Sequence, residues 1–393
     1  MRLPYTLLAI LLFVNIFIDS YIFLALRSYL RRTIWSKIHA TIAIIATVAY
    51  ISLMFMPVRT GGNALIQVAM WTIYVLISIY LPKYIFVIFE LLSRIPKIFK
   101  HKQSKALCII GVVVSFILFG TMWWGALFNR FNYQIESVTV KDKAIPAAFN
   151  DYKIVQISDL HLGTYGNDTE YISKLVKRIN ELHADVILFT GDIVNRNTQE
   201  LLPFVSVLSE LKAKDGVYSI LGNHDYGDYE DWSSDEEKAA NLQKLKDLQA
   251  KMGWTMLNNE HTALTAGNDS IILIGVENIG DPPFHIYGDL HKAYANIGDK
   301  NFKILMSHNP AHWTNDIKDN ESSNIGLTLA GHTHAMQIEL FGLSPAYFRY
   351  RTWGGMYEDN SNQRLYVNIG IGTVGFPARI GATPEITLFT LKH

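Results

Sequence analysis

Asp159 and His161 are the first residues in the sequence whose types and spacing suggest metal chemistry. They follow a short run rich in β-branched residues, 154–157, which is typical of a buried strand. Two positions apart on an extended chain, their side chains point to the same face, and carboxylate and imidazole groups both bind divalent first-row metals. Because Asp-x-His also occurs at ordinary polar strand ends, the pair alone is weak evidence for a site.

Further polar motifs follow predicted strands in the same manner. The strands 186–189, 217–221, 303–307 and 327–330 lead into Gly191-Asp192, Gly222-Asn223-His224-Asp225, His308-Asn309-Pro310 and Gly331-His332-Thr333-His334. Helices predicted at 169–183 and 200–212 alternate with the first of these strands, which indicates an α/β sheet whose sites collect at the carboxyl ends of its strands. The candidate metal ligands are Asp159, His161, Asp192, Asn223, His308, His332 and His334.

The other periodic segments of the same region are mostly strands. Alternating or apolar runs predict strands at 132–140, 271–276, 364–369 and 385–391, and a helix is predicted at 236–252. Because strands dominate the later half, we expect an α/β domain in which two sheets pack face to face and are flanked by helices.

The first third of the chain is much more apolar than the rest. Long apolar stretches occupy 3–26, 34–56, 64–81 and 106–128, and the third could also be taken to end at 92. Since about 20 apolar residues in a helix cross a bilayer, we expect four membrane spans in a domain of residues 1–128, followed by a globular domain of residues 129–393. The first stretch could instead be a cleaved signal peptide, but it is too long for an h-region and no small-x-small cleavage site is evident.

The cationic loops between these stretches predict the orientation of the chain. The second connection, 57–63, has only Arg59, whereas the first and third are strongly basic. Their residues are Arg27, Arg31, Arg32 and Lys37 in the first, and Lys83, Arg94, Lys97, Lys100, Lys102 and Lys105 in the third. Because cationic loops stay in the cytoplasm, we expect an integral, multi-pass membrane protein whose globular domain is extracytoplasmic.

Charge and cysteine content exclude some classes of function. The chain has 35 Lys+Arg and 35 Asp+Glu residues, and no long basic run with interleaved aromatics, so no nucleic-acid partner is expected. The single cysteine, Cys108, excludes an intrachain disulfide.

Asp19 lies near the end of the first apolar stretch, where an interface-facing or helix-packing role is favoured over a functional site. No pattern of paired charges is visible in the spans, which disfavours a transporter.

The ordered motifs Asp-x-His, Gly-Asp, Gly-Asn-His-Asp and Gly-His-Thr-His, together with the His308 loop, resemble those of the calcineurin-like metallophosphoesterases. The resemblance covers nearly the whole of residues 132–393. The tail, with Gly372-Thr-Val-Gly375, Arg379-Ile-Gly and Pro384-Glu-Ile, is similar to a branch of membrane-associated phosphodiesterases, some of which act on UDP-diacylglucosamine. The common pattern does not include four spans, so the resemblance says nothing about residues 1–128.

The resemblance implies a role for each candidate residue. One divalent metal would be held by Asp159, His161 and His334, the other by Asn223, His308 and His332, with Asp192 bridging them. Two metals about 3.5–4 Å apart clamp the attacking and leaving oxygens of a phosphoryl group and activate a water. The residue types suit manganese, iron, zinc or cobalt and do not choose among them. His224 would stabilise the transition state or protonate the leaving oxygen, and Asp225 would orient it.

The segment 341–357, after the last metal motif, is rich in aromatic and cationic residues. They are Phe341, Tyr347, Phe348, Tyr350, Trp353 and Tyr357, with Arg349 and Arg351. One interpretation is a membrane-interface surface that meets a phospholipid head group. Another is a packed loop whose arginines pair with acids. A third is that Arg349, Arg351 or Arg379 contacts a substrate phosphate.

These observations favour a membrane-anchored two-metal hydrolase. It would cleave a phosphoester, a phosphodiester or pyrophosphate, of a lipid-linked or envelope substrate. Its partners would be membrane lipids and that lipid-linked or small phosphoester; the sequence leaves the oligomeric state open. The alternative from another class is a non-catalytic metal-binding membrane receptor or scaffold. In a narrower alternative the protein is still an enzyme, but its spans serve only as an anchor and its substrate is soluble.

Overall fold

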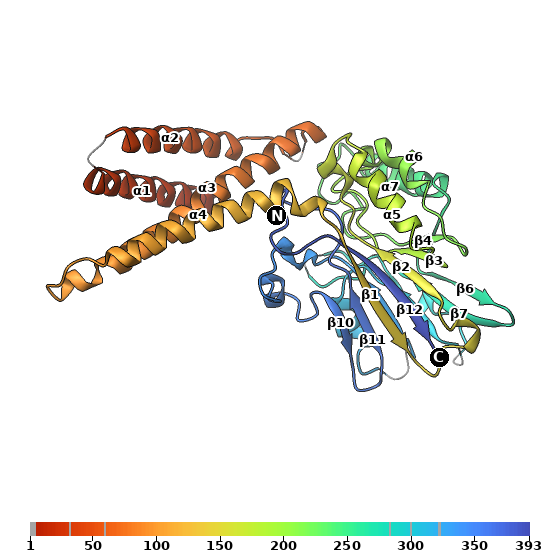
Figure 1. Cartoon of the computed structure of the whole chain (residues 1–393). Coiled ribbons are helices and arrows are strands. Elements are labelled where there is room, and N and C mark those ends of the chain that lie inside the picture. The colour runs from red at the N-terminus through yellow and green to blue at the C-terminus, as the bar shows by residue number, and fades with distance from the viewer. Residues whose placement is uncertain (1–4, 31–32, 59, 283, 299–300, 321–323) are drawn as a thin grey trace. The chain divides into compact units, whose positions relative to one another are not determined.

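The computed structural model describes residues 5–30, 33–58, 60–282, 284–298, 301–320 and 324–393 (Figure 1). The chain divides into two compact units, residues 1–126 with 375–377, and residues 127–374 with 378–393. Leu3, Arg31, Arg32 and Arg59, which entered the predictions of spans and orientation, lie outside the described residues. The two units are referred to below as the helical unit and the catalytic unit.

The helical unit is built from four long apolar helices. They are α1 (Tyr5–Tyr29), α2 (Ile34–Met54), α3 (Asn63–Ile98) and α4 (Lys105–Leu127). Each is long and apolar enough to cross a bilayer, which confirms the four predicted spans within the described part of the chain. The third helix has 36 residues and continues well past 81, the shorter of the two predicted ends.

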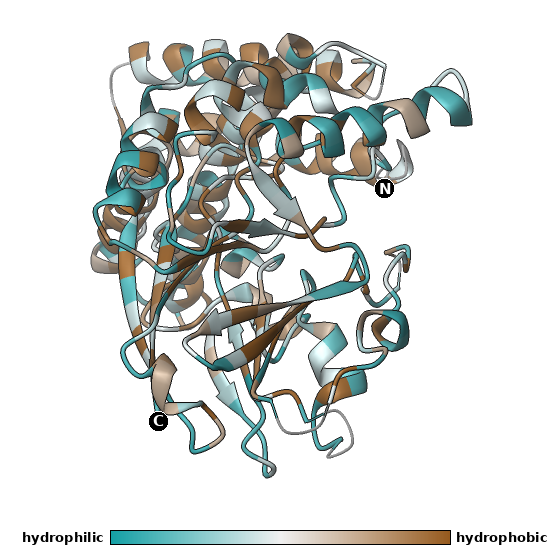
Figure 2. Ribbon diagram, turned by 90° about the vertical axis from the view of Figure 1, so that its right-hand side faces the viewer, coloured by the Kyte–Doolittle hydropathy of each residue, from teal (hydrophilic) through white to brown (hydrophobic). Residues whose placement is uncertain are grey.

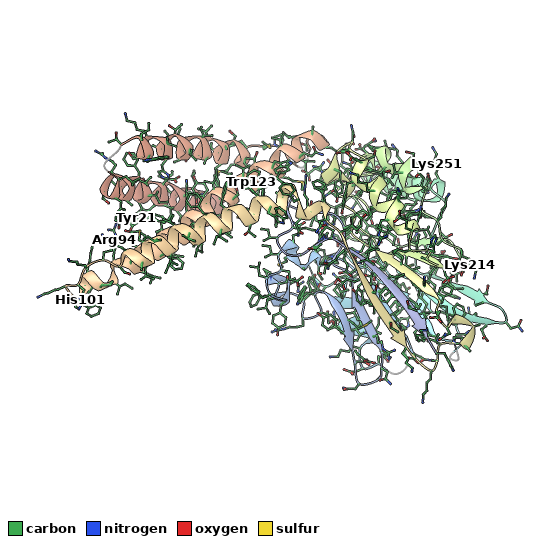
Figure 3. The ribbon with its side chains drawn as sticks, in the orientation of Figure 1. Tyr21, Arg94, His101, Trp123, Lys214 and Lys251 are labelled. Carbon is green, nitrogen blue, oxygen red and sulfur yellow. The ribbon has the colours of Figure 1, made fainter. Side chains whose placement is uncertain are left out.

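Buried charges connect the helices of this unit. Asp19 in α1 accepts from Lys83 in α3 at 2.6 Å and from the Tyr80 hydroxyl at 3.0 Å. Glu90 is fully buried and accepts hydrogen bonds from Tyr21, Tyr29 and Arg94; Figure 3 labels Tyr21 and Arg94. The expectation that the spans lack paired charges is therefore wrong. The partners are 64 residues apart in sequence for Asp19 and Lys83, so no local pattern shows them. Such interhelical pairs support the helix-packing role of Asp19.

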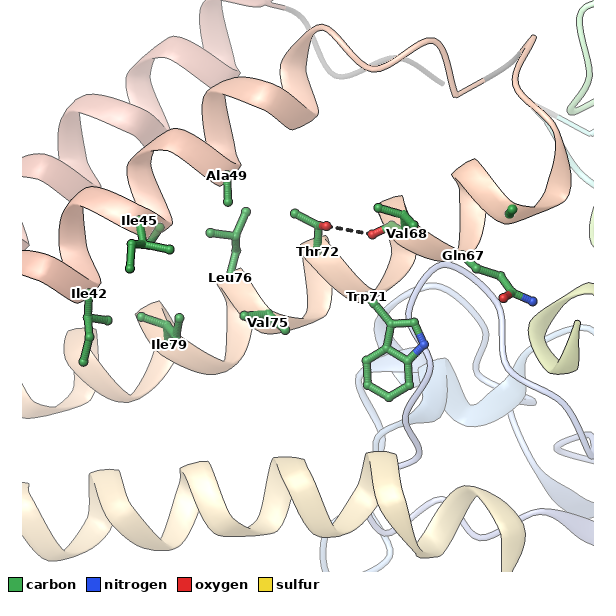
Figure 4. A pocket seen from close by; sticks show the side chains of 12 residues that line it. Ile42, Ile45, Ala49, Gln67, Val68, Trp71, Thr72, Val75, Leu76 and Ile79 are labelled. Atoms are coloured by element: carbon green, nitrogen blue, oxygen red, sulfur yellow. Dashed lines mark hydrogen bonds between the residues drawn. The ribbon is translucent and has the colours of Figure 1, made fainter.

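A hollow of about 650 Å³ lies between α2 and α3 (Figure 4). Its lining is almost wholly aliphatic, with Trp71, Thr72 and Gln67 as the exceptions. Neither a metal-ligating nor a titratable side chain lines this hollow, so it offers no group for acid–base or metal chemistry.

The described part of the catalytic unit contains two six-stranded sheets (Figure 1). The first has the strand order β1-β12-β2-β3-β4-β5 and the second β10-β11-β9-β8-β7-β6. The strands of the first sheet are β1 (Gln134–Lys141), β2 (Lys153–Ile157), β3 (Val186–Phe189), β4 (Val217–Ser219), β5 (Trp254–Met256) and β12 (Glu385–Lys392). Those of the second are β6 (Glu260–Ala266), β7 (Asp269–Gly275), β8 (Lys303–Met306), β9 (Leu327–Ala330), β10 (Gly355–Glu358) and β11 (Arg364–Val367).

The two sheets pack face to face, as expected. Apolar residues of the first sheet, such as Ile154 and Leu188, share one buried cluster with Leu273, Ile304 and Leu329 of the second. In Figure 2 strands of both sheets carry hydrophobic residues, shown in brown. The strands β2, β3 and β4 run parallel, and β3 is buried at every position, which is typical of a strand covered on both faces.

Helices cover the outer face of the first sheet. They are α5 (Glu170–Asn180), α6 (Val205–Leu208) and α7 (Asp235–Lys251). The short α8 (Leu290–Ala293) instead packs with residues of the second sheet. In α5, Ile172, Leu175 and Val176 join the cluster that contains Ile187 of β3. With this face covered, the carboxyl ends of the parallel strands are where a site is expected in such a sheet.

One predicted helix and three strands differ from the expectation. The segment 200–212 forms a 3₁₀ helix, Thr198–Phe204, followed by a single α-helical turn, because Pro203 removes a backbone donor. The strands β5, β6 and β10 were not predicted. Polar or exposed residues interrupt them, so their sequences lack a clear apolar period.

Candidate metal centre

The candidate ligands all follow strands of the two sheets. Asp159 and His161 come after β2, Asp192 after β3, Asn223 after β4, His308 after β8, and His332 and His334 after β9. Since β2, β3 and β4 are parallel in one sheet and β8 and β9 in the other, each set of carboxyl ends forms one edge. Packing of the sheets brings these two edges together.

The ligand atoms converge in two adjoining groups. In the first, atoms of Asp159, His161 and His334 lie within 4.8 Å of one another, and His334 Nε2 is 3.0 Å from His161 Nε2 and 3.2 Å from Asp159 Oδ1. In the second, Asp192, His308 and His332 are equally close. Asp192 Oδ2 lies 3.2 Å from His308 Nε2 and 3.6 Å from His161 Nε2. The Asp192 carboxylate therefore lies between the two groups.

The unsatisfied polar atoms of the centre fit divalent cations. Within the described residues, the buried atom Asn223 Oδ1 has no hydrogen-bond partner, and buried polar atoms without one are uncommon in folded proteins. His161 Nε2 and His334 Nε2 face each other, so a proton or a cation must separate their lone pairs. Neutral imidazoles, an amide oxygen and two carboxylates are the donors that first-row divalent metals prefer.

Close approach of the ligands explains two glycines of the motifs. A Cβ at Gly222 would collide with the Asp192 carboxylate, and one at Gly331 with that of Asp159. Several ligands also have a left-handed backbone, with φ of 54° at Asp159, 60° at Asp192 and 74° at His332. Non-glycine residues adopt this conformation at a cost of about 1 kcal/mol or more, and such strain concentrates at functional sites.

His224 reaches the same centre without belonging to either group. One of its ring nitrogens lies within 4.8 Å of ligand atoms of His161 and Asp192. Its Nδ1 is 2.6 Å from the carbonyl oxygen of Asn195, and its ring stacks on Tyr229 at 4.2 Å between centroids. Burial lowers the pKa of His224, which favours the neutral imidazole in the absence of a nearby developing charge.

Comparison with known proteins identifies the family of this chain. Residues 152–336 match the family described as calcineurin-like phosphoesterase, and residues 1–130 match one described as probable calcineurin-like phosphoesterase, transmembrane domain. A metallophosphoesterase of Bacillus subtilis named YkuE, described as uncharacterized, is 36% identical over 265 residues, which cover 65% of this chain and 84% of that protein. The chain belongs to the calcineurin-like phosphoesterase family. It is a metal-dependent phosphoesterase and a multi-pass membrane protein.

A further relative and a solved structure are also similar to this chain. A transmembrane protein with metallophosphoesterase domain from Bos taurus is 30% identical over 263 residues, which cover 66% of this chain and 57% of that protein. Among solved structures, a phosphopantetheinyl hydrolase of Mycobacterium tuberculosis is similar at a TM-score of 0.34 and 13% identity, covering 58% of this chain and 91% of that one. The finer resemblance to UDP-diacylglucosamine hydrolases stays a prediction.

Asp225 has a different role from the one expected in this phosphoesterase. Its carboxylate accepts from the backbone N–H groups of Gly222, Asp192 and Ile193, each at 2.9 Å. It therefore ties together the two loops that carry Asp192 and Asn223. The hydrogen bond to His224 comes from the Asn195 carbonyl, so the expectation that Asp225 orients His224 is corrected. Asn195 and Tyr229 have no motif signal, and only the folded chain reveals them.

Arg379 also differs from its expected role as a substrate contact. It is fully buried, and its guanidinium donates to the carbonyl oxygens of Gly372 and Ile369 at 2.9 Å and of Ala382 at 3.3 Å. Its Nη2 lies 3.2 Å from Nδ1 of His334. A guanidinium so enclosed cannot reach a substrate phosphate. Arg379 instead positions His334 and the tail of the domain.

Arg349 and Arg351 each have a partner on the protein. Arg349 forms an ion pair with Asp281 and donates to the Pro282 carbonyl, as the packed-loop interpretation expects. The Arg351 guanidinium lies over the Tyr347 ring, 4.2 Å from its centroid. Within the same segment, Tyr350 reaches the centre, and its hydroxyl is 3.0 Å from His332 Nε2. Contact of either arginine with substrate stays a prediction.

Proposed function

We propose that the centre holds two divalent metals and hydrolyses a phosphodiester or pyrophosphate of a lipid-linked or envelope substrate. The observation that supports this best is the Asp192 carboxylate, which lies between two groups of metal-ligating side chains. Asp159, His161 and His334 would hold one metal, and Asn223, His308 and His332 the other. Bound metals would act as Lewis acids toward phosphoryl oxygens and lower the pKa of a water.

We assign the proton chemistry to His224. Because the Asn195 carbonyl accepts from Nδ1, Nε2 is the nitrogen left for substrate. Protonated at Nε2, the imidazole would donate to the leaving oxygen as negative charge develops there. Stacking on Tyr229 keeps the ring in this orientation.

His224→Ala in the full chain should lower kcat for bis(p-nitrophenyl) phosphate by about 10²–10⁴-fold, the usual contribution of general acid–base catalysis. The measurement uses detergent-purified protein with added manganese, and metal content is determined in parallel, because His224 is not assigned as a ligand. His291→Ala, at an exposed histidine, is the matched control and should keep full activity.

Two outcomes would contradict the proposal. An unchanged kcat in His224→Ala would show that His224 is not the general acid. Wild-type protein that contains metal yet hydrolyses none of a panel of phosphoesters would favour the receptor or scaffold.

We further propose that the catalytic unit lies outside the cytoplasm. The connections around Lys37 and Lys102 are basic, whereas the connection between α2 and α3 is not. A periplasm- or exterior-active reporter fused after His393 should therefore be active, and the same reporter placed after Lys100 should be silent. Activity only in the second fusion would reverse the orientation.

A further inference from the structure

Large apolar side chains cluster in the solvent-exposed segment that follows the last two ligands. Phe341 is 103% exposed, Phe348 90% and Leu343 75%. Met336, Leu340 and Tyr347 are also exposed, and we call these six side chains the apolar rim. A single exposed apolar residue is ordinary, but six within thirteen consecutive positions form a patch of the kind that marks an interaction site.

The backbone beneath the apolar rim is held firmly in place. Leu340 and Leu343 exchange backbone hydrogen bonds across a tight turn, and Glu339 donates to the carbonyl of Ile380. The buried Ser344 hydroxyl donates to the carbonyl of Ala335 at 2.5 Å. Folding therefore fixes this segment and turns its apolar side chains outward.

The turn itself is made with an unfavourable residue. Phe341 has φ of 55° and Gly342 has φ of 75°, so both central positions are left-handed. Asn or Gly suits such a position, whereas a bulky side chain costs about 1–2 kcal/mol. A fully exposed phenylalanine gains no packing energy that would offset this cost. Its presence points to a contact outside the domain.

The same segment divides into an inward and an outward half. Tyr350 reaches His332, and the carbonyl of Trp353 accepts from Thr333, so the inward half supports the metal centre. The apolar rim is the outward half, and Met336 comes only two residues after the ligand His334. The rim and residues that contact the centre are therefore carried by one continuous stretch of the chain.

We infer that the apolar rim inserts into the surface of the lipid bilayer. Six residues separate the end of α4 at Leu127 from the start of β1 at Gln134. Fully extended, the seven peptide steps from Leu127 to Gln134 span at most about 25 Å, so the domain cannot leave the vicinity of the membrane. Arg349 and Arg351 follow the rim, and aromatic residues beside cations suit the head-group region.

This inference adds to the proposed function. Only its consequence for catalysis, the hydrolysis of a lipid at the membrane surface, rests on that proposed function. With the rim in the head-group layer, the metal centre lies at the depth of phosphoesters that remain anchored in the bilayer. The substrate class would be a lipid whose scissile phosphorus lies directly at the membrane surface. Insertion itself is a separate property and can be measured without turnover.

The insertion test uses nitroxide labels on the full chain in vesicles of phosphatidylglycerol and phosphatidylethanolamine. Cys108→Ser removes the single cysteine, and Phe341→Cys and Phe348→Cys then take one label each. Lys214→Cys is the control, an exposed site just before β4 at the opposite end of the sheet from the ligands (Figure 3). We expect the labels at 341 and 348 to be shielded from a water-soluble relaxant and open to oxygen, and the label at 214 to show the reverse. Equal water exposure at all three positions would overturn the inference.

The catalytic test compares two substrates in the double variant Phe341→Ser, Phe348→Ser. Hydrolysis of a dioleoylglycerol p-nitrophenyl phosphodiester in vesicles should fall about tenfold, while hydrolysis of soluble bis(p-nitrophenyl) phosphate should be unchanged. An equal loss on both substrates would overturn the role in lipid presentation. Shielded labels in a protein that hydrolyses neither substrate would support insertion and contradict the proposed function alone.

Discussion

Asp192→Asn is expected to lower kcat for bis(p-nitrophenyl) phosphate by on the order of 10³-fold or more. The change keeps the shape of the side chain and an acceptor for the His224 backbone N–H, which now donates to Oδ1 at 2.8 Å. It removes the one negative charge shared by the two ligand groups. Loss of several kcal/mol of metal-dependent stabilisation corresponds to at least this factor in rate.

Metal analysis of the same variant tests the bridging role. We expect Asp192→Asn to retain less metal per chain than the wild type, since cation repulsion is no longer offset between the groups. Asp247→Asn, at an exposed position of α7, is the control and should match the wild type in activity and metal content. Full activity in Asp192→Asn would refute a shared carboxylate.

Arg379→Ala is expected to destabilise the catalytic unit by about 3–5 kcal/mol. The change leaves the buried carbonyl groups of Gly372, Ile369 and Ala382 without their donor. For a domain of this size the loss corresponds to a fall in melting temperature on the order of 10 °C. Thermal unfolding of the detergent-solubilised chain, followed by near-ultraviolet circular dichroism, measures it.

A surface arginine provides the comparison. Arg351→Ala removes an exposed cation that lies on Tyr347, and its melting temperature should stay within about 1–2 °C of the wild type. Arg379→Lys should recover only part of the loss, because an ammonium cannot donate along the fixed directions of the guanidinium. A melting temperature unchanged in Arg379→Ala would show that the carbonyl groups find other donors.

The sequence predicts the candidate ligands because each lies directly after a strand whose composition is distinctive. Asp192 follows Val186–Phe189, an apolar run that can be recognised without any tertiary information. The glycine before a ligand is likewise a local signal, since Gly222 is required by the close approach of Asp192. The packing of two sheets was expected from the many strands of the later half, whereas the strand order, with β12 between β1 and β2, was not predicted.

Other features depend on contacts between distant residues, and local patterns do not show them. The sequence suggested that Arg379 could bind a phosphate. The structure shows instead that it is buried and donates to three carbonyl groups. The Asn195 carbonyl that holds His224 is a backbone atom and has no side-chain signature. The pair Asp19 and Lys83 joins two helices that are separate apolar stretches in the sequence.

The position of β12 has a consequence for the order in which the enzyme is made. This strand lies between β1, which leads out of α4, and β2, which leads to Asp159 and His161. It follows every other described strand in the chain, so β1 and β2 have no partner on that side until translation has passed Lys392. The metal centre therefore matures only after all four helices have emerged from the ribosome. We therefore expect membrane insertion to precede the appearance of hydrolytic activity, and a premature stop that removes β12 to disrupt the centre although every candidate ligand remains in the chain.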